Sequence, residues 1–161
     1  MAKTLFSDDD FNKVIEVGST IGFGKTIKKV RIDLTWEGEP RIDLDICAFL
    51  LKEDVLNGNA CTFAEDKRKY GYNNPLAWMD DTLPLSGDGS VIGSWDDKGD
   101  PEPGELSGET IHVQLDKVDV EMCDSIVIAA AVSKEDIVEG KTFADAKSPT
   151  VTVYNAENGK T

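Results

Sequence analysis

The chain has 161 residues and a formal net charge of −14, from 31 acidic and 17 basic side chains. This length fits one domain, residues 1–161, and no run of about 18 apolar residues predicts a transmembrane helix. Because so acidic a chain repels nucleic acid and anionic lipid, we expect no nucleic-acid partner, no membrane insertion, and a cation as the charged partner. The N-terminus has no apolar leader, so the expected location is the cytoplasm or a particle assembled there.

The first motif along the chain is GSTIGFGKT, residues 18–26, which ends like a phosphate-binding P-loop. The first glycine of that motif would fall at Ser19. A P-loop also leads into a helix, whereas residues 27–36 alternate as a strand. We therefore interpret Gly18, Gly22 and Gly24 as a turn between two antiparallel strands, and expect no nucleotide there.

Most of the remaining apolar pattern is that of β-strands bounded by Gly, Asn, Asp and Pro. The expected strands are residues 12–17, 27–36, 42–51, 89–95, 109–115, 124–132 and 149–155. Only Ser133 followed by KEDIVEG has the pattern of a capped helix, and residues 141–147 suit a second short turn. The pattern predicts a mainly β protein, an antiparallel β-sandwich with one or two short helical turns.

Few residues suit catalysis. The three cysteines have no metal-binding spacing, and Cys47 and Cys123 beside apolar runs are expected to be buried thiols. The single histidine, His112, alternates with Ile111 and Val113, so it is expected on the solvated face of a strand. We expect no enzyme.

The acidic residues suggest a metal site. Asp43 and Asp45 lie two apart on an expected strand, so their side chains share one face, roughly 6.5–7 Å apart. The loop of residues 94–109 adds more carboxylates, and Lys98 is the one basic residue between Asp80 and Glu109. Oxygen-only ligands suit Ca²⁺, although the loop lacks the EF-hand spacing.

Several motifs in order resemble one family. KVRIDLTWEG, DLDICAFLL, YNNP, DGSV, an acidic loop, ETIHVQLDKV and SIVIAAAVSKEDIVEGKTFADA occur over roughly residues 13–158. Together they resemble the TerD domain of bacterial tellurium-resistance and stress proteins.

The resemblance implies a β-sandwich that binds one or two calcium ions at one end, with no established catalytic activity. Carried over position by position, the implied ligands are Asp43, Asp45, Asn73, Asn74, Asp96, Asp97 and Glu109. The chain departs from the family pattern where Trp95 replaces a glycine. Its acidic loop is longer, contains Pro101 and Pro103, and lacks two acidic positions near its end.

The family usually continues with further strands, so the resemblance also bears on the strand at 149–155. We expect this strand, or the sheet face beneath it, to lie against another chain. The alternative is that residues 4–11 fold back to cover it with Leu5, Phe6 and Phe11.

The leading functional hypothesis is a non-catalytic calcium-binding module in stress response or protein assembly, acting with protein partners or as a homo-oligomer. The alternative is a structural component of a phage or phage-like particle, completed by neighbouring chains. Two further possibilities are a carbohydrate-binding sandwich that uses Trp36, Trp78 and Trp95, and a hydrolase with paired carboxylates.

Overall fold

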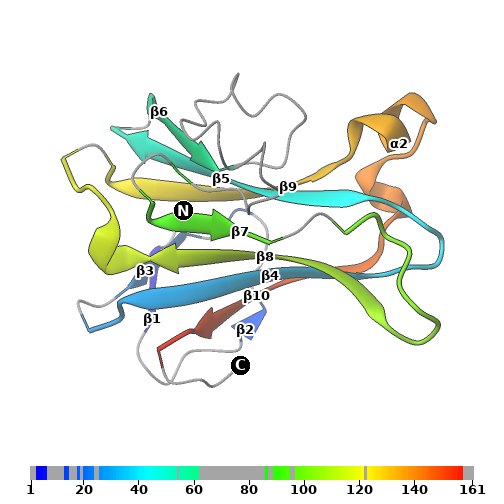
Figure 1. Cartoon of the computed structure of the whole chain (residues 1–161), viewed down its shortest axis with the longest axis horizontal. Helices are drawn as coiled ribbons and strands as arrows, with labels where there is room; N and C mark the ends of the chain where they lie inside the picture. The colour runs from blue at the N-terminus through cyan, green and yellow to red at the C-terminus, as the bar shows by residue number, and fades with distance from the viewer. Residues whose placement is uncertain are drawn as a thin grey trace.

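The structure is a computed structural model of the chain, shown as a ribbon in Figure 1. It describes residues 3–6, 13–14, 18, 20–23, 26–53, 55–61, 86, 89–94, 97–121 and 123–157, with backbone only for 3–6, 13–14 and 55–61. The statements below concern these residues.

The larger layer is an antiparallel sheet of five strands. In spatial order they are β2 (Lys13–Val14), β10 (Lys147–Asn155), β4 (Lys29–Glu37), β8 (Leu106–Gln114) and β7 (Val91–Gly93). β4 pairs with β8 along its whole length, from Lys29 opposite Gln114 to Glu37 opposite Leu106.

The second layer is an antiparallel sheet of three strands. Its order is β6 (Val55–Cys61), β5 (Leu44–Lys52) and β9 (Ser125–Val132). A separate parallel pair joins β1 (Lys3–Phe6) to β3 (Thr20–Phe23). The helical segments are short: η2 (Leu115–Lys117), α2 (Lys134–Val138) and η3 (Phe143–Asp145).

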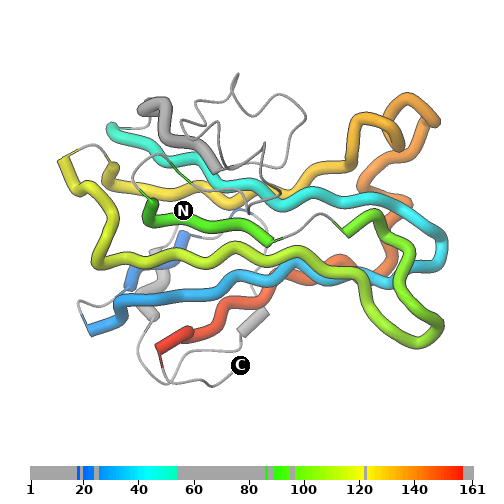
Figure 2. The backbone as a smooth tube through the Cα atoms, viewed as in Figure 1, coloured from blue at the N-terminus to red at the C-terminus, as the bar shows by residue number. Residues whose placement is uncertain are grey.

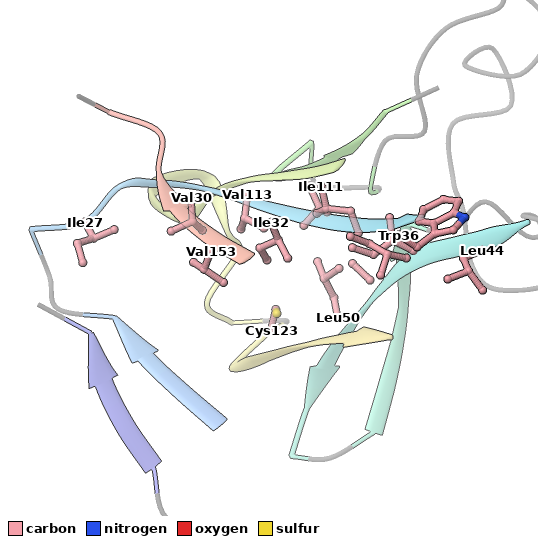
Figure 3. Packing of buried hydrophobic residues seen from close by; sticks show 14 of the residues in the cluster. Ile27, Val30, Ile32, Trp36, Leu44, Leu50, Ile111, Val113, Cys123 and Val153 are labelled. Carbon is pink, nitrogen blue, oxygen red and sulfur yellow. The ribbon is translucent and has the colours of Figure 1, made fainter. Parts of the chain in front are cut away.

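The core lies between the two sheets. On the facing strands, apolar residues at alternate positions point inward, and these apolar rows face each other across the sandwich (Figure 3). On β5 the inward row of Leu44, Ile46, Ala48 and Leu50 is 0% exposed. Trp36 of β4 is also fully buried, and its indole Nε1 donates to the carbonyl of Ile42 at 2.9 Å. This hydrogen bond joins the two sheets just before β5 begins.

The predicted fold class is confirmed, and most predicted strands occur within a few residues of their expected bounds. The Ser133 cap is also confirmed, because its side chain accepts the N–H of Asp136. Cys47 and Cys123 are buried thiols, as expected. Trp36 proves to be a core residue, while Trp78 and Trp95 lie outside the described residues.

One prediction about the N-terminal region was wrong. Gly22 is not in a turn, because it belongs to β3 and pairs with Leu5 of a parallel strand. The C-terminal strand β10 lies between β4 and β2, where Thr152 pairs with Val14, so the chain itself covers part of its edge. That β10 or the sheet face beneath it lies against another chain stays a prediction. Alternation predicts a strand but not its neighbours, so neither pairing could be read from the sequence.

The N-terminal alternative was correct only in part. The chain's own N-terminal region does pair with β10, through β2, while residues 7–11 lie outside the described residues. Leu5 and Phe6 belong to β1, which pairs with β3, and Phe11 lies outside the described residues.

Candidate functional site

The predicted calcium residues that the structure describes lie around the start of β5. At this end of the molecule, on the right in Figures 1 and 2, the chain entering β5 lies near α2 and the loop 97–105. The sheets themselves do not cover this end, so side chains and turns supply the contacts.

The backbone of Ile42 and Asp43 is fixed from three directions. Trp36 donates to the carbonyl of Ile42, as described above. The N–H of Asp43 donates to Oδ2 of Asp136 at 2.7 Å, and the carbonyl of Asp43 accepts the N–H of Ser133 at 2.9 Å. The backbone at Ile42 and Asp43 is therefore held by hydrogen bonds with a side chain of β4 and with the start of α2.

Asp136 contacts the candidate site but was not singled out in the sequence analysis. It is only 3% exposed, and Nζ of Lys141 donates to its Oδ1 at 2.8 Å. Burial raises the pKa of Asp136, but the hydrogen bonds from Lys141 and from the Asp43 N–H outweigh it, so the pKa lies below its ordinary value. The available signal was the spacing Ser133-x-x-Asp136, which predicts a cap but not a carboxylate that reaches back to another strand.

The acidic loop docks on the same backbone through Gly99. A Cβ at this position would collide with the carbonyl of Ile42, and Gly99 has a φ of +74°, which favours glycine. Asp97 braces the loop, because its Oδ1 accepts the N–H of Gly99 at 2.9 Å and its Oδ2 accepts that of Gly108 at 2.8 Å. Loop and strand therefore form one packed unit.

Glu109 was predicted at the end of the acidic loop and at the start of the strand 109–115. It lies on β8, which begins earlier than expected, at Leu106, and it faces inward and is only 1% exposed. Its Oε2 accepts the N–H of Ile46 at 2.7 Å and its Oε1 that of Asp97 at 3.2 Å. The described pairing of β6 with β5 begins at Ala48. The N–H of Ile46 lies before that point on β5, and the carboxylate of Glu109 accepts its hydrogen bond.

Asp43 and Asp45 are on the opposite side of β5 from this carboxylate. Asp45 alternates with the buried inward row, so it faces outward, and it is partly exposed. Asp43 precedes the strand and is 4% exposed. The ammonium of Lys98 lies 3.6 Å from Oδ2 of Asp43.

The described part of the predicted ligand set therefore has two groups. Asp97 and Glu109 use both carboxylate oxygens to accept backbone N–H groups. Asp43 and Asp45 are the other described candidates: Asp43 is buried just before β5, and Asp45 faces the outer side of the strand. Asn73, Asn74 and Asp96 lie outside the described residues. Within the described ranges, no group of three or more His, Cys, Asp or Glu side chains is arranged to hold a metal.

The donor chemistry nevertheless fits a hard cation. Asp43 is a buried carboxylate, 4% exposed, and the ammonium of Lys98 already lies 3.6 Å from its Oδ2. A buried carboxylate favours a nearby cation because burial penalises its charged form. Asp45 adds further oxygens on the same strand, and oxygen ligands suit Ca²⁺.

His112 is on the outer face of the five-stranded sheet, as predicted. It pairs across the sheet with Arg31, whose guanidinium lies 2.9 Å from Asp33 and 4.2 Å from the ring centre of Tyr154. Burial and the charge of Arg31 lower the pKa of His112. Arg31 is thus already engaged by an acid and an aromatic ring.

Comparison with known proteins identifies one family. The model of the TerD domain matches residues 14–161. No curated protein and no solved structure matches the chain. Among the described residues, no helix is long and apolar enough to cross a membrane.

Proposed function

Because the chain belongs to the TerD domain family, we propose that it is a non-catalytic calcium-binding module that acts in stress response or protein assembly. Asp43 and Asp45 would hold the ion beside the start of β5, together with Asn73, Asn74 and Asp96. Asp97 and Glu109 would act as positioning residues that fix the loop and the strand. The bound ion would neutralise the acidic end and hold its surface in one shape for a protein partner.

The observation that supports this proposal best is the fixed backbone of Asp43. The N–H of Asp43 donates a hydrogen bond to Asp136, and its carbonyl accepts one from the N–H of Ser133. The carbonyl of the preceding Ile42 accepts a hydrogen bond from Trp36. A carboxylate on a fixed backbone loses little conformational entropy when it binds an ion, whereas ordering one flexible residue costs roughly 1–2 kcal/mol. The geometry therefore supports an organised cation site.

Calorimetry with calcium tests the proposal. Asp45→Ala should weaken calcium binding more than Asp100→Ala, because Asp100 is exposed in the loop and Asp45 lies on a strand. Lys98→Ala should strengthen binding, because it removes a cation that competes for Asp43. Equal effects of Asp45→Ala and Asp100→Ala would show that the strand carboxylates are not ligands.

Thermal unfolding gives a second measurement. An ion that binds only the folded state adds about 2.7 kcal/mol at a hundredfold excess over Kd, so calcium should raise the melting temperature and chelator should lower it. Magnesium should substitute poorly, since it requires a smaller octahedral shell. Identical melting curves in calcium, magnesium and chelator would contradict the proposal.

The alternative role, in a phage or phage-like particle, requires a surface that neighbouring chains can complete. The described structure has a candidate for such a surface at the edge of the smaller sheet, formed by β9.

A further inference from the structure

The outer edge of β9 has no paired strand in the described part of the chain. β9 pairs with β5 on one side, and the sheet order β6-β5-β9 leaves it at the edge. Unlike many edge strands, it contains no charged residue and no proline from Ser125 to Val132. Such an edge is a template for another strand.

The register shows which backbone groups point outward. The N–H of Ser133 donates to Asp43 across the β5–β9 pair, whereas the N–H of Ile46 points away from β9 to Glu109. Since bonded pairs alternate along an antiparallel ladder, the odd-numbered residues of β9 bond β5. The even-numbered residues therefore direct N–H and C=O away from it, and these are Ile126, Ile128, Ala130 and Val132.

The same four residues face the core but are incompletely covered. All four pack against the core cluster and remain partly exposed, whereas the inward row of the adjacent β5 is 0% exposed. An edge position alone does not explain this, because Val91 on the edge strand β7 is also fully buried. The smaller sheet is thus open on the side of β9.

The larger sheet extends past this opening. In the two facing sheets, β6 packs against β7, and β5 packs against β8. The larger sheet then continues past β8 through β4, β10 and β2. On the inward row of β10, Val153 is buried, but Val151 is only partly buried. The β1–β3 pair lies toward Ile27, away from Trp36, in Figure 3. One more strand beside β9 would cover Val151.

We propose that the outer edge of β9 binds an extended segment of a partner polypeptide as an added antiparallel strand. The segment should alternate apolar and polar residues, so that its apolar row extends the row of Ile126, Ile128, Ala130 and Val132. Antiparallel pairing lets facing residues exchange both backbone hydrogen bonds. Asp124 precedes β9 and Lys134 follows it, so an antiparallel segment that begins with an acidic residue and ends with a basic one would complement the charges at the two ends of β9.

A second whole copy of the chain fits this edge less well. Antiparallel pairing of two identical strands around a two-fold axis places both larger sheets on the same side. Each larger sheet extends beyond β9 through β10 and β2, so the two would overlap. Two chains of net charge −14 also repel each other. A single extended segment avoids both problems.

The test uses a blocked peptide of the length of β9 that alternates valine and threonine, with glutamate first and lysine last. The full chain should bind this peptide, measured by fluorescence anisotropy, and hydrogen exchange at Ile126, Ile128, Ala130 and Val132 should slow. Two N-methylated versions of the peptide serve as a pair. Methylation of the alternate amides that face β9 should abolish binding, whereas methylation of the alternate amides that point away from β9 should leave binding nearly unchanged. No binding, or equal loss with both methylated peptides, would overturn the proposal.

Protein variants give a second measurement. Ala130→Pro removes an outward N–H and leaves the N–H groups that bond β5, so it should weaken peptide binding about tenfold or more without changing calcium binding. Val138→Lys is the control, because Val138 is 80% exposed on α2. A stable homodimer in ultracentrifugation that the peptide does not dissociate would favour the second copy and overturn the proposal. Strand binding at β9 does not depend on calcium, so this proposal and the proposed calcium-binding function can fail separately.

Discussion

The start of β5 and the outer edge of β9 are both places where backbone extends beyond its strand partners. At the start of β5, side chains supply the partners: Trp36 for Ile42, Asp136 for Asp43 and Glu109 for Ile46. On the outer edge of β9, no described strand supplies them. The first region is therefore a fixed scaffold that suits an ion, and the second is an open template that suits a strand.

The strongest way to break the fixed region is Glu109→Ala. The change leaves the N–H groups of Ile46 and Asp97 without their carboxylate and opens a cavity between the sheets. Each unsatisfied buried group costs about 1–3 kcal/mol, so we expect a loss of roughly 4 kcal/mol in the free energy of unfolding by urea. Glu105→Ala is the control, since Glu105 is exposed in the same loop and should change stability by less than about 0.5 kcal/mol.

Docking of the loop can be tested with two glycines of similar conformation. Gly99 and Gly104 have φ values of +74° and +88°, so alanine is strained at both. Only Gly99 lies against the backbone of Ile42, whereas a Cβ at Gly104 would meet nothing within 4 Å. Gly99→Ala should therefore cost about 2 kcal/mol more than Gly104→Ala and should also weaken calcium binding. Equal costs would mean that the loop does not need this contact.

The pH dependence of stability tests Asp136. Its pKa is lowered in the folded chain, so its stabilisation is complete above the carboxyl pKa of the unfolded chain. That stabilisation is lost as the pH falls through the lower folded value. Asp136→Asn should cost about 2 kcal/mol at neutral pH and less in acid, because the amide cannot neutralise Lys141.

Urea unfolding between about pH 3 and pH 7 makes this comparison. Glu135→Gln is the control, because Glu135 is exposed on the same helix and should leave the acid limb of the stability curve unchanged. A cost of Asp136→Asn that is constant across this range would rule out the charge of Asp136 as the cause.

The smallest effect concerns two buried serines that should respond in opposite directions. Ser133 caps α2, so Ser133→Ala should cost about 1 kcal/mol. Oγ of Ser107 is buried without a hydrogen-bond partner in the described structure, so Ser107→Ala should be neutral or should stabilise by up to about 1 kcal/mol. Thermal melts distinguish the two signs. A large loss at Ser107 would reveal a partner for its hydroxyl.

The sequence predicted local structure better than it predicted neighbours. Alternation around Leu44–Leu50 and Ile126–Val132 is enough to identify β5 and β9, because one face of each meets an apolar core. The Ser133 cap is equally local. The parallel pairing of Gly22 with Leu5 is not local, since it depends on which strands lie side by side in space.

The same distinction applies to the candidate site. The spacing of Asp43 and Asp45 predicted one shared face, and the structure places Asp45 outward on β5. The roles of Glu109 and Asp136 could not be predicted, because each acts on the backbone of a segment far away in the sequence. Glu109 was expected to be a calcium ligand and Asp136 was not singled out, whereas the fold buries both carboxylates against backbone N–H groups.

The interior position of β10 has a consequence for how the protein is made. β10 is the last strand that the structure describes, yet it lies between β4 and β2 in the sheet. Val14 of β2 therefore cannot pair until Thr152 of β10 has been synthesised. During translation the smaller sheet can form once Val132 has left the ribosome, but the larger sheet cannot close until β10 emerges. Pairing over so long a separation in the sequence is slow, and it leaves the edge of β4 exposed meanwhile. Newly made chains should therefore be most prone to aggregation and proteolysis in the interval before residues 147–155 are synthesised.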